Sequence, residues 1–256
     1  MNASLPSLFV SHGSPMLLLD QVEGRDYSQW GKNLPKPKAI LVFSAHWEGD
    51  SLAFGEIDTH QELIYDFYGF PDELYKIQYP APGAPWLVEE INTLLGMQIP
   101  MKQRGLDHGV YVPFVHMWPE ANIPMLQISL PQTMSDKDLF EMGQSLAPLR
   151  ERGVLIIGAG ALTHNLRAWN PKLGDEPVEW AKVFDDWIEK TLNENDIDAL
   201  LNWKTLAPNA ELNHPTAEHF RPLFIAAGAG LGETVTFPTT GFSYGIFTRR
   251  SVQFGI

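Results

Sequence analysis

The stretch Leu8-Phe9-Val10-Ser11-His12-Gly13-Ser14-Pro15 predicts a buried strand that ends in a histidine and a turn. The pattern recurs at residues 39–47, where an apolar run leads into His46, and at residues 153–157, which precede His164. Apolar runs of this length between turn residues are typical of strands that are buried on both faces of a sheet. Because ligand sites in open α/β sheets lie beyond the carboxyl ends of the strands, we expect the three histidines at one site.

The rest of the chain alternates predicted strands with predicted helices. The signals place helices at residues 85–95, 135–152, 177–192 and 217–227, a strand at 123–128, and a hairpin from 234–237 and 244–247. This alternation predicts an α/β fold with a mainly parallel or mixed central sheet flanked by helices. The 256 residues contain no linker or low-complexity run, so we expect a single domain over residues 1–256 with its site at the C-terminal edge of the strands.

The composition excludes several classes of function. The net charge of −13 argues against binding to nucleic acid or to an anionic membrane surface, because both are bound through clustered Lys and Arg. The chain has no cysteine, so any metal must be held by nitrogen and oxygen ligands. The sequence shows neither a signal-peptide pattern nor an apolar run long enough to span a bilayer, so we expect a soluble, cytoplasmic protein. The choice between a monomer and a homo-oligomer stays open.

The eight histidines differ in their sequence context. A single buried histidine is more often a hydrogen-bonded core residue than a ligand, and we interpret His60 and His116 in that way. Pro215 suits the start of a helix, which would place His219 one turn into it, with Glu218 as the rival ligand. His214 lies five residues before His219 and would point away from it on a helix, so its role stays open.

Other motifs in the chain are weak. The run Gly158-Ala159-Gly160 partly matches a dinucleotide-binding loop but lacks the third glycine, so we interpret it as close backbone packing that presents His164. Ser11 and Ser14 lie near histidines, yet the chain has no Gly-x-Ser-x-Gly nucleophile motif. The aromatic residues between 65 and 70 fit a core segment or a pocket wall equally well.

Seven motifs, taken together and in order along nearly the whole chain, resemble the DODA-type extradiol ring-cleavage dioxygenases of the class III, LigB-like superfamily. They are Ser11-His12-Gly13-Ser14-Pro15, Ser44-Ala45-His46-Trp47, Asp66-Phe67-Tyr68-Gly69-Phe70-Pro71, Tyr79-Pro80-Ala81-Pro82-Gly83, Asp107-His108-Gly109, His164-Asn165-Leu166 and Pro215-Thr216-Ala217-Glu218-His219-Phe220.

The resemblance implies one mononuclear metal ion held by His12, His46 and His219. It also implies that His164 and His108 are acid/base and oxygen-stabilising groups. The wider superfamily uses two histidines and a carboxylate, as is typical of non-haem Fe(II) oxygenases, whereas the matching position here is a histidine. Fe(II) would support activity. An all-histidine site also suits Zn(II), which would occupy it in isolated protein with His164 as a fourth ligand.

The reaction implied by the resemblance is insertion of O₂ into a DOPA-like catechol, giving a muconic semialdehyde. Candidates for stacking on the aromatic ring of the substrate are Trp47, Tyr68 and Tyr111. The alternatives are a zinc-dependent hydrolase that uses the same histidines, a non-catalytic LigB-like binding protein, and a structural histidine cluster without a metal.

Overall fold

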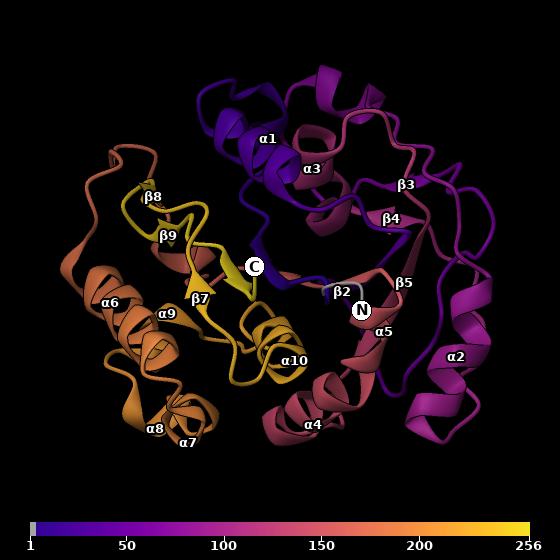
Figure 1. The fold of residues 1–256 in the computed structure, drawn as a ribbon. Helices are drawn as coiled ribbons and strands as arrows, with labels where there is room; N and C mark the ends of the chain where they lie inside the picture. The colour runs from indigo at the N-terminus through magenta and orange to yellow at the C-terminus, as the bar shows by residue number, and fades with distance from the viewer. Residues whose placement is uncertain (1–3) are drawn as a thin grey trace.

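A six-stranded sheet forms the centre of the fold, in the order β5-β2-β6-β1-β10-β7 (Figure 1). The structure is a computed structural model and describes residues 4–256. Strands β5, β2, β6 and β1 are parallel, whereas β10 is antiparallel to both β1 and β7. The predicted single α/β domain with a mainly parallel, mixed sheet is therefore confirmed. The strands of this sheet are β1 (Ser7–Ser11), β2 (Ala39–Gly49), β5 (Met125–Pro131), β6 (Val154–Gly160), β7 (Val235–Thr236) and β10 (Val252–Phe254).

Helices cover both faces of the sheet. Helices α1 (Glu23–Asn33) and α3 (His108–Met117) pack on one face, and α4 (Asp136–Leu146) and α10 (Pro222–Ala229) pack on the other (Figure 1). The side chains of β1 alternate between the two cores: Leu8 and Val10 pack toward α1 and α3, and Phe9 packs toward α10. Both faces of the central strands are thus buried, which explains their uninterrupted apolar runs.

Local signals set the ends of several helices as predicted. Helix α2 (Trp86–Leu95) follows Pro85 and ends at Gly96, whose φ of 64° is left-handed. Ser135 and Asp138 form a reciprocal capping box at the start of α4. The remaining elements are α6 (Glu179–Asn193) and the short segments β3 (Leu63–Ile64), β4 (Leu106–Asp107), β8 (Phe242–Ser243), β9 (Phe247–Thr248), η1 (Pro15–Leu19), η2 (Asp72–Lys76), η3 (Leu166–Ala168), α5 (Pro148–Glu151), α7 (Ile197–Leu201), α8 (Trp203–Leu206) and α9 (Ala210–Asn213).

Two predictions near the C-terminus are wrong. The predicted helix at residues 217–227 begins only at Pro222, which lacks an N–H and suits the first helical position, so His219 lies in the turn before α10. The predicted hairpin is also displaced, because β7 pairs with β10 and β8 pairs with β9. Tyr244 and Gly245 both have positive φ, and they form the tight turn between β8 and β9.

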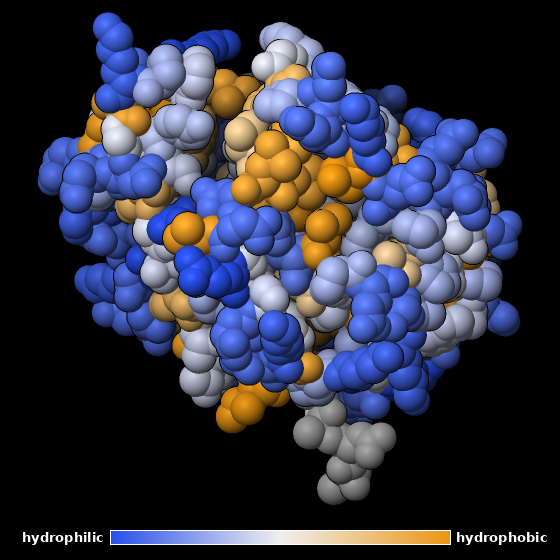
Figure 2. Space-filling view, turned by 90° about the horizontal axis from the view of Figure 1, so that it is seen from above, coloured by the Kyte–Doolittle hydropathy of each residue, from blue (hydrophilic) through white to orange (hydrophobic). Residues whose placement is uncertain are grey.

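The face of the molecule above the sheet edge in Figure 1 carries both hydrophilic and hydrophobic residues. Figure 2, which views the molecule from the top of Figure 1, shows an area of hydrophobic residues surrounded by hydrophilic ones. Within residues 4–256, no helix combines the length and the apolar character that a membrane span requires.

Candidate metal centre

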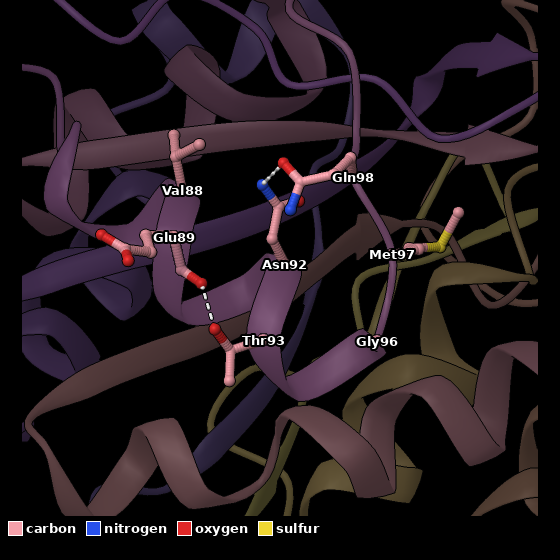
Figure 3. Close-up of a pocket in the computed structure, with 7 residues that line it drawn as sticks. All are labelled: Val88, Glu89, Asn92, Thr93, Gly96, Met97 and Gln98. Carbon is pink, nitrogen blue, oxygen red and sulfur yellow. Dashed lines mark hydrogen bonds between the residues drawn. The ribbon is translucent and has the colours of Figure 1, made fainter.

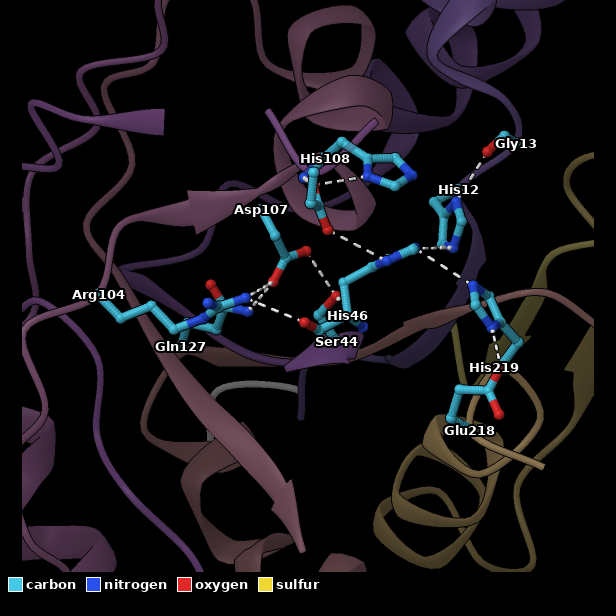
Figure 4. A network of polar contacts seen from close by, with 11 residues as sticks. His12, Gly13, Ser44, His46, Arg104, Asp107, His108, Gln127, Glu218 and His219 are labelled. Carbon is cyan, nitrogen blue, oxygen red and sulfur yellow. Dashed lines mark hydrogen bonds and ion pairs between the residues drawn. The ribbon is translucent and has the colours of Figure 1, made fainter. Parts of the chain in front are cut away.

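Three histidines from distant parts of the chain converge beyond the C-terminal edge of the parallel strands. His12 directly follows β1, His46 lies near the end of β2, and His219 precedes α10. The Nε2 atom of His46 lies 3.2 Å from Nε2 of His12 and 3.2 Å from Nε2 of His219 (Figure 4). The three rings can therefore offer one nitrogen each to a single ion, as the clustering of their ligand atoms within 4.8 Å also indicates.

The second nitrogen of each ring has its own acceptor. Nδ1 of His12 lies 2.8 Å from the carbonyl oxygen of Gly13, and Nδ1 of His219 lies 2.9 Å from a carboxylate oxygen of Glu218. Nδ1 of His46 lies 3.2 Å from Oδ2 of Asp66. Because these oxygens only accept, each Nδ1 carries the proton and donates, which leaves the Nε2 lone pair of a neutral ring free for a metal.

The electrostatic environment keeps His12 and His219 neutral. Burial, with the neighbouring histidines, holds the pKa of His12 and that of His219 well below the usual value. Neutral imidazoles with lone pairs facing one another repel in the absence of a cation, and they bind a divalent ion without first losing protons. The residues thus fit a mononuclear metal such as Fe(II) or Zn(II).

The glycine run at the end of β6 holds His219 in place. The carbonyl oxygen of His219 accepts a hydrogen bond of 2.9 Å from the N–H of Ala161. A Cβ added at Gly160 would lie 2.2 Å from that same oxygen, and one at Gly158 would lie 2.1 Å from the carbonyl oxygen of Pro222. Close backbone packing by these glycines is confirmed, but the segment that it positions is the turn carrying His219 rather than His164 as predicted.

His164 and His108 flank the three converging rings. The ring of His164 stacks on that of His219, with centroids 3.4 Å apart and planes 12° apart. Burial, followed by repulsion from the protonated forms of His214 and His46, lowers the pKa of His164 to about 3, so this ring is neutral at neutral pH. His108 is the first residue of α3, and its ring centroid lies 4.0 Å from that of His46.

Asp66 is a site residue to which the sequence analysis gave no role. Its Oδ1 atom lies 2.7 Å from Nδ1 of His108, and its Oδ2 atom lies 3.2 Å from Nδ1 of His46. Burial opposes ionisation, but the hydrogen bonds from His108 and His46 hold the pKa of the carboxyl well below its usual range. The motif Asp66-Phe67-Tyr68-Gly69 contributed to the family resemblance, and its acidic residue was the available signal.

A second carboxylate supports β2 beneath the site. Asp107 is fully buried and accepts hydrogen bonds of 2.7 Å from the Ser44 hydroxyl and 2.6 Å from the Gln127 amide (Figure 4). Arg104 lies 3.4 Å from the same carboxylate and donates to the carbonyl oxygen of His46. This network ties the backbone at His46 to β5 and to the start of α3.

The three aromatic residues predicted to stack on a substrate lie in different surroundings. Trp47 is buried beneath the guanidinium of Arg104, Tyr111 is fully buried in α3, and Tyr68 is 92% exposed. Two other rings contact the site histidines: Phe67 packs edge-on against His108, with centroids 5.6 Å apart, and Phe247 lies 6.1 Å from His164. Substrate contact by Trp47, Tyr68 and Tyr111 stays a prediction.

The other histidines make structural hydrogen bonds. Nitrogen atoms of His60 and His116 lie 3.2 and 2.8 Å from the carbonyl oxygens of Met125 and Leu17. His214 is buried among aromatic rings and bonds to the carbonyl oxygen of Leu162 at 2.8 Å. A separate pocket at the C-terminal end of α2 is lined by side chains among which only Glu89 is ionisable (Figure 3), so its lining offers no comparable ligand set.

Known proteins are similar to this chain in sequence and in fold. Residues 6–255 match the family described as the catalytic LigB subunit of aromatic ring-opening dioxygenase. The chain belongs to the LigB family. This LigB-family chain is 42% identical over 232 residues to a 4,5-DOPA dioxygenase extradiol of Beta vulgaris, covering 87% of the chain and 86% of the relative.

Bacterial relatives cover the chain more completely. A 4,5-DOPA dioxygenase extradiol of Escherichia coli (strain K12) is 36% identical over 259 residues, covering 98% of this chain and 95% of the relative. The crystal structure of an uncharacterized protein from Escherichia coli K12 superposes with a TM-score of 0.82 at 32% identity, covering 98% of this chain and all of that one (100%). The chain is thus homologous to extradiol dioxygenases over nearly its full length.

Proposed function

We propose that this LigB-family chain is an extradiol dioxygenase that inserts both atoms of O₂ into a catechol and releases a ring-opened muconic semialdehyde. The single observation that carries the proposal is the convergence of three imidazole Nε2 atoms, from His12, His46 and His219, on one point. In this proposal, residues 1–256 work as one catalytic domain. The cytoplasmic location expected from the sequence stays a prediction.

His12, His46 and His219 would hold the ion, and His164 is the candidate for a fourth ligand. Bound Fe(II) would supply the redox chemistry that joins a catechol to O₂, whereas Zn(II) has no redox chemistry and would support only Lewis-acid reactions. The carboxylates of Asp66 and Glu218 lie behind two of the three ligand rings, so they compensate the charge of a divalent ion without occupying its coordination positions.

The flanking histidines would move the protons. A catechol must lose at least one phenolic proton, and the neutral ring of His164 has a lone pair that can accept it. The negative charge of the bound catecholate would raise the proton affinity of this buried ring. His108 gives its Nδ1–H to Asp66, so it accepts through Nε2 when neutral and donates through Nε2 when protonated. In its protonated form it would act through Nε2 as the proton donor on the oxygen side of the reaction.

The substrate class is a catechol with a DOPA-like side chain. The support is the name of the relatives from Beta vulgaris and Escherichia coli, both 4,5-DOPA dioxygenase extradiol. Phe67 and Phe247 contact His108 and His164 from two sides, so they are the rings best placed to bound an aromatic substrate.

The protein is first reconstituted anaerobically with Fe(II) or with Zn(II). Oxygen consumption by the two samples is then measured with L-DOPA and with protocatechuate as substrates. We expect oxygen uptake and a yellow semialdehyde product with Fe(II) alone. Ester or amide hydrolysis by the Zn(II) protein, with no oxygen uptake by the Fe(II) protein, would instead identify a zinc hydrolase.

The role of His164 has its own test. We expect His164→Ala to retain Fe(II) and to lose at least about 100-fold in turnover, because general acid/base groups typically contribute that much. Turnover close to that of the wild type would contradict the assignment. Metal analysis of each sample shows whether the loss comes from the proton transfer or from the ion.

A further inference from the structure

Asp66 contacts both halves of the site, the ligand side and the proton-transfer side. Oδ2 faces Nδ1 of His46 at 3.2 Å, and Oδ1 faces Nδ1 of His108 at 2.7 Å. Oδ1 also accepts a hydrogen bond of 3.2 Å from the backbone N–H of His108. Each carboxylate oxygen therefore serves a different histidine, and the two rings lie with their centroids 4.0 Å apart.

The start of α3 anchors this carboxylate. The residue at the N-cap of α3, Asp107, makes no capping hydrogen bond, because its carboxylate is engaged by Ser44, Gln127 and Arg104. Asp66 supplies the acceptor for the first N–H of the helix in its place. The carboxylate thus lies between a rigid helix end and two rings, although it comes from an irregular segment of the chain.

Both ring nitrogens of His46 and the Nδ1 atom of His108 already have partners. His46 has its Nε2 directed at His12 and His219, so only its Nδ1 can be held from behind. With Nδ1 of His108 bonded to Asp66, Nε2 of His108 is the nitrogen that remains for the reaction. In both rings the nitrogen that works in the site is selected by the bond that the other nitrogen makes.

We propose that Asp66 is a positioning residue for two histidines at once: it sets the tautomer and orientation of His46 as a metal ligand, and it holds the ring of His108 through Nδ1 so that Nε2 is the nitrogen left for proton transfer. Only the second half of this role, the one at His108, rests on the proposed function. The loss of Asp66 would therefore weaken metal binding and, separately, slow turnover at saturating metal.

The primary variant is Asp66→Asn, which keeps the shape of the side chain but has only one acceptor oxygen and turns an N–H₂ group toward one of the two rings. We expect the affinity for Co(II) or Zn(II), measured by competition with a chelator, to fall about 10- to 100-fold, as is typical of changes behind a ligating histidine. We expect kcat at saturating Fe(II) to fall by at least about tenfold as well, because His108 is then free to rotate. Asp72→Asn, an exposed aspartate a few residues along the chain, is the matched control and should behave as the wild type.

A double-mutant comparison separates the two halves of the proposal. In a His108→Asn background, Asp66→Asn should still weaken metal binding by the same factor, because that effect passes through His46. It should cost less than about twofold in kcat, because its effect on turnover passes through a ring that is no longer there. A merely structural role would lower kcat equally in both backgrounds and would overturn the proposal.

The affinity for Co(II) or Zn(II) tests the proposal independently of ring cleavage. If the wild type shows no oxygen uptake, the proposed function fails, and Asp66 is judged by the Co(II) and Zn(II) affinities alone. Affinities within twofold of the wild type in Asp66→Asn would then overturn the role at His46. Should Asp66→Asn fail to fold by circular dichroism, Asp66→Glu replaces it: this variant keeps both acceptor oxygens, and it should keep more metal affinity than Asp66→Ala. Equal affinities of these two variants would refute the proposal.

Discussion

A single methyl group at Gly160 should disturb the metal centre from two directions. The carbonyl oxygen of Gly160 accepts the N–H of His12 at 2.9 Å, and the next N–H, that of Ala161, donates to the carbonyl oxygen of His219 at 2.9 Å. Gly160 therefore lies between two of the three proposed ligand residues, His12 and His219. Gly160→Ala adds a Cβ that would lie 2.2 Å from the carbonyl oxygen of His219, where ordinary contacts begin at 3.4 Å.

The size of the effect follows from this distance. The contact is about 1.2 Å too short, and the atom in the way is backbone, so the turn carrying His219 must move as a unit. Overpacking of this kind costs about 1–3 kcal/mol, which corresponds to a fall in Tm of roughly 2–6 °C for a chain of this size. Functional constellations tolerate displacements of only about 0.5 Å, so we expect the metal affinity to fall by more than about tenfold.

Two measurements test the reasoning, thermal unfolding of the metal-free protein and chelator competition with Co(II) or Zn(II). Gly174→Ala is the matched control, because nothing lies within 4 Å of its added Cβ and its change in stability should stay within about 0.5 kcal/mol. If Gly160→Ala bound metal within twofold of the wild type and unfolded at the same temperature, the close approach of β6 to His219 would not position the ligand.

Further predictions concern the carboxylate behind His219 and the response to acid. Glu218→Gln keeps an acceptor for Nδ1 of His219 but removes the charge, so the metal affinity should fall about tenfold, and about 100-fold in Glu218→Ala; wild-type affinity in both variants, by chelator competition, would contradict this role. Burial lowers the pKa of His214 to about 4 from an unfolded value of about 6.5, so the unfolded chain binds more protons and stability is lost as pH falls from 6.5 toward 4. Between pH 7 and pH 5, the free energy of unfolding of the metal-free wild type, measured with denaturant, should therefore fall by about 2 kcal/mol more than that of His214→Gln. A loss of the same size in His214→Gln would show that the histidine is not its source.

Much of the fold could be predicted because the relevant signals are local. The apolar runs that became β1, β2 and β6 reflect burial on both faces, and the capping box at Ser135 requires only neighbouring residues. The sequence pattern also placed His12 and His46 at the ends of parallel strands, which meet at one edge of the sheet for any chain with this topology. The hairpin prediction failed because the outcome depended on pairing between distant segments: β7 pairs with β10. The helix before Ala229 starts later than predicted because Pro222 takes the first helical position.

The sequence by itself determined the class of the fold, the absence of thiolate ligands and the set of histidines available to a metal. Only the tertiary structure decided how those histidines are used. The approach of Gly160 to His219 and the bridge from Asp66 to His46 and His108 join residues that are far apart in the chain. Such contacts depend on the packing of whole elements, to which neither periodicity nor spacing responds, and they select the nitrogen that each ring presents to the site.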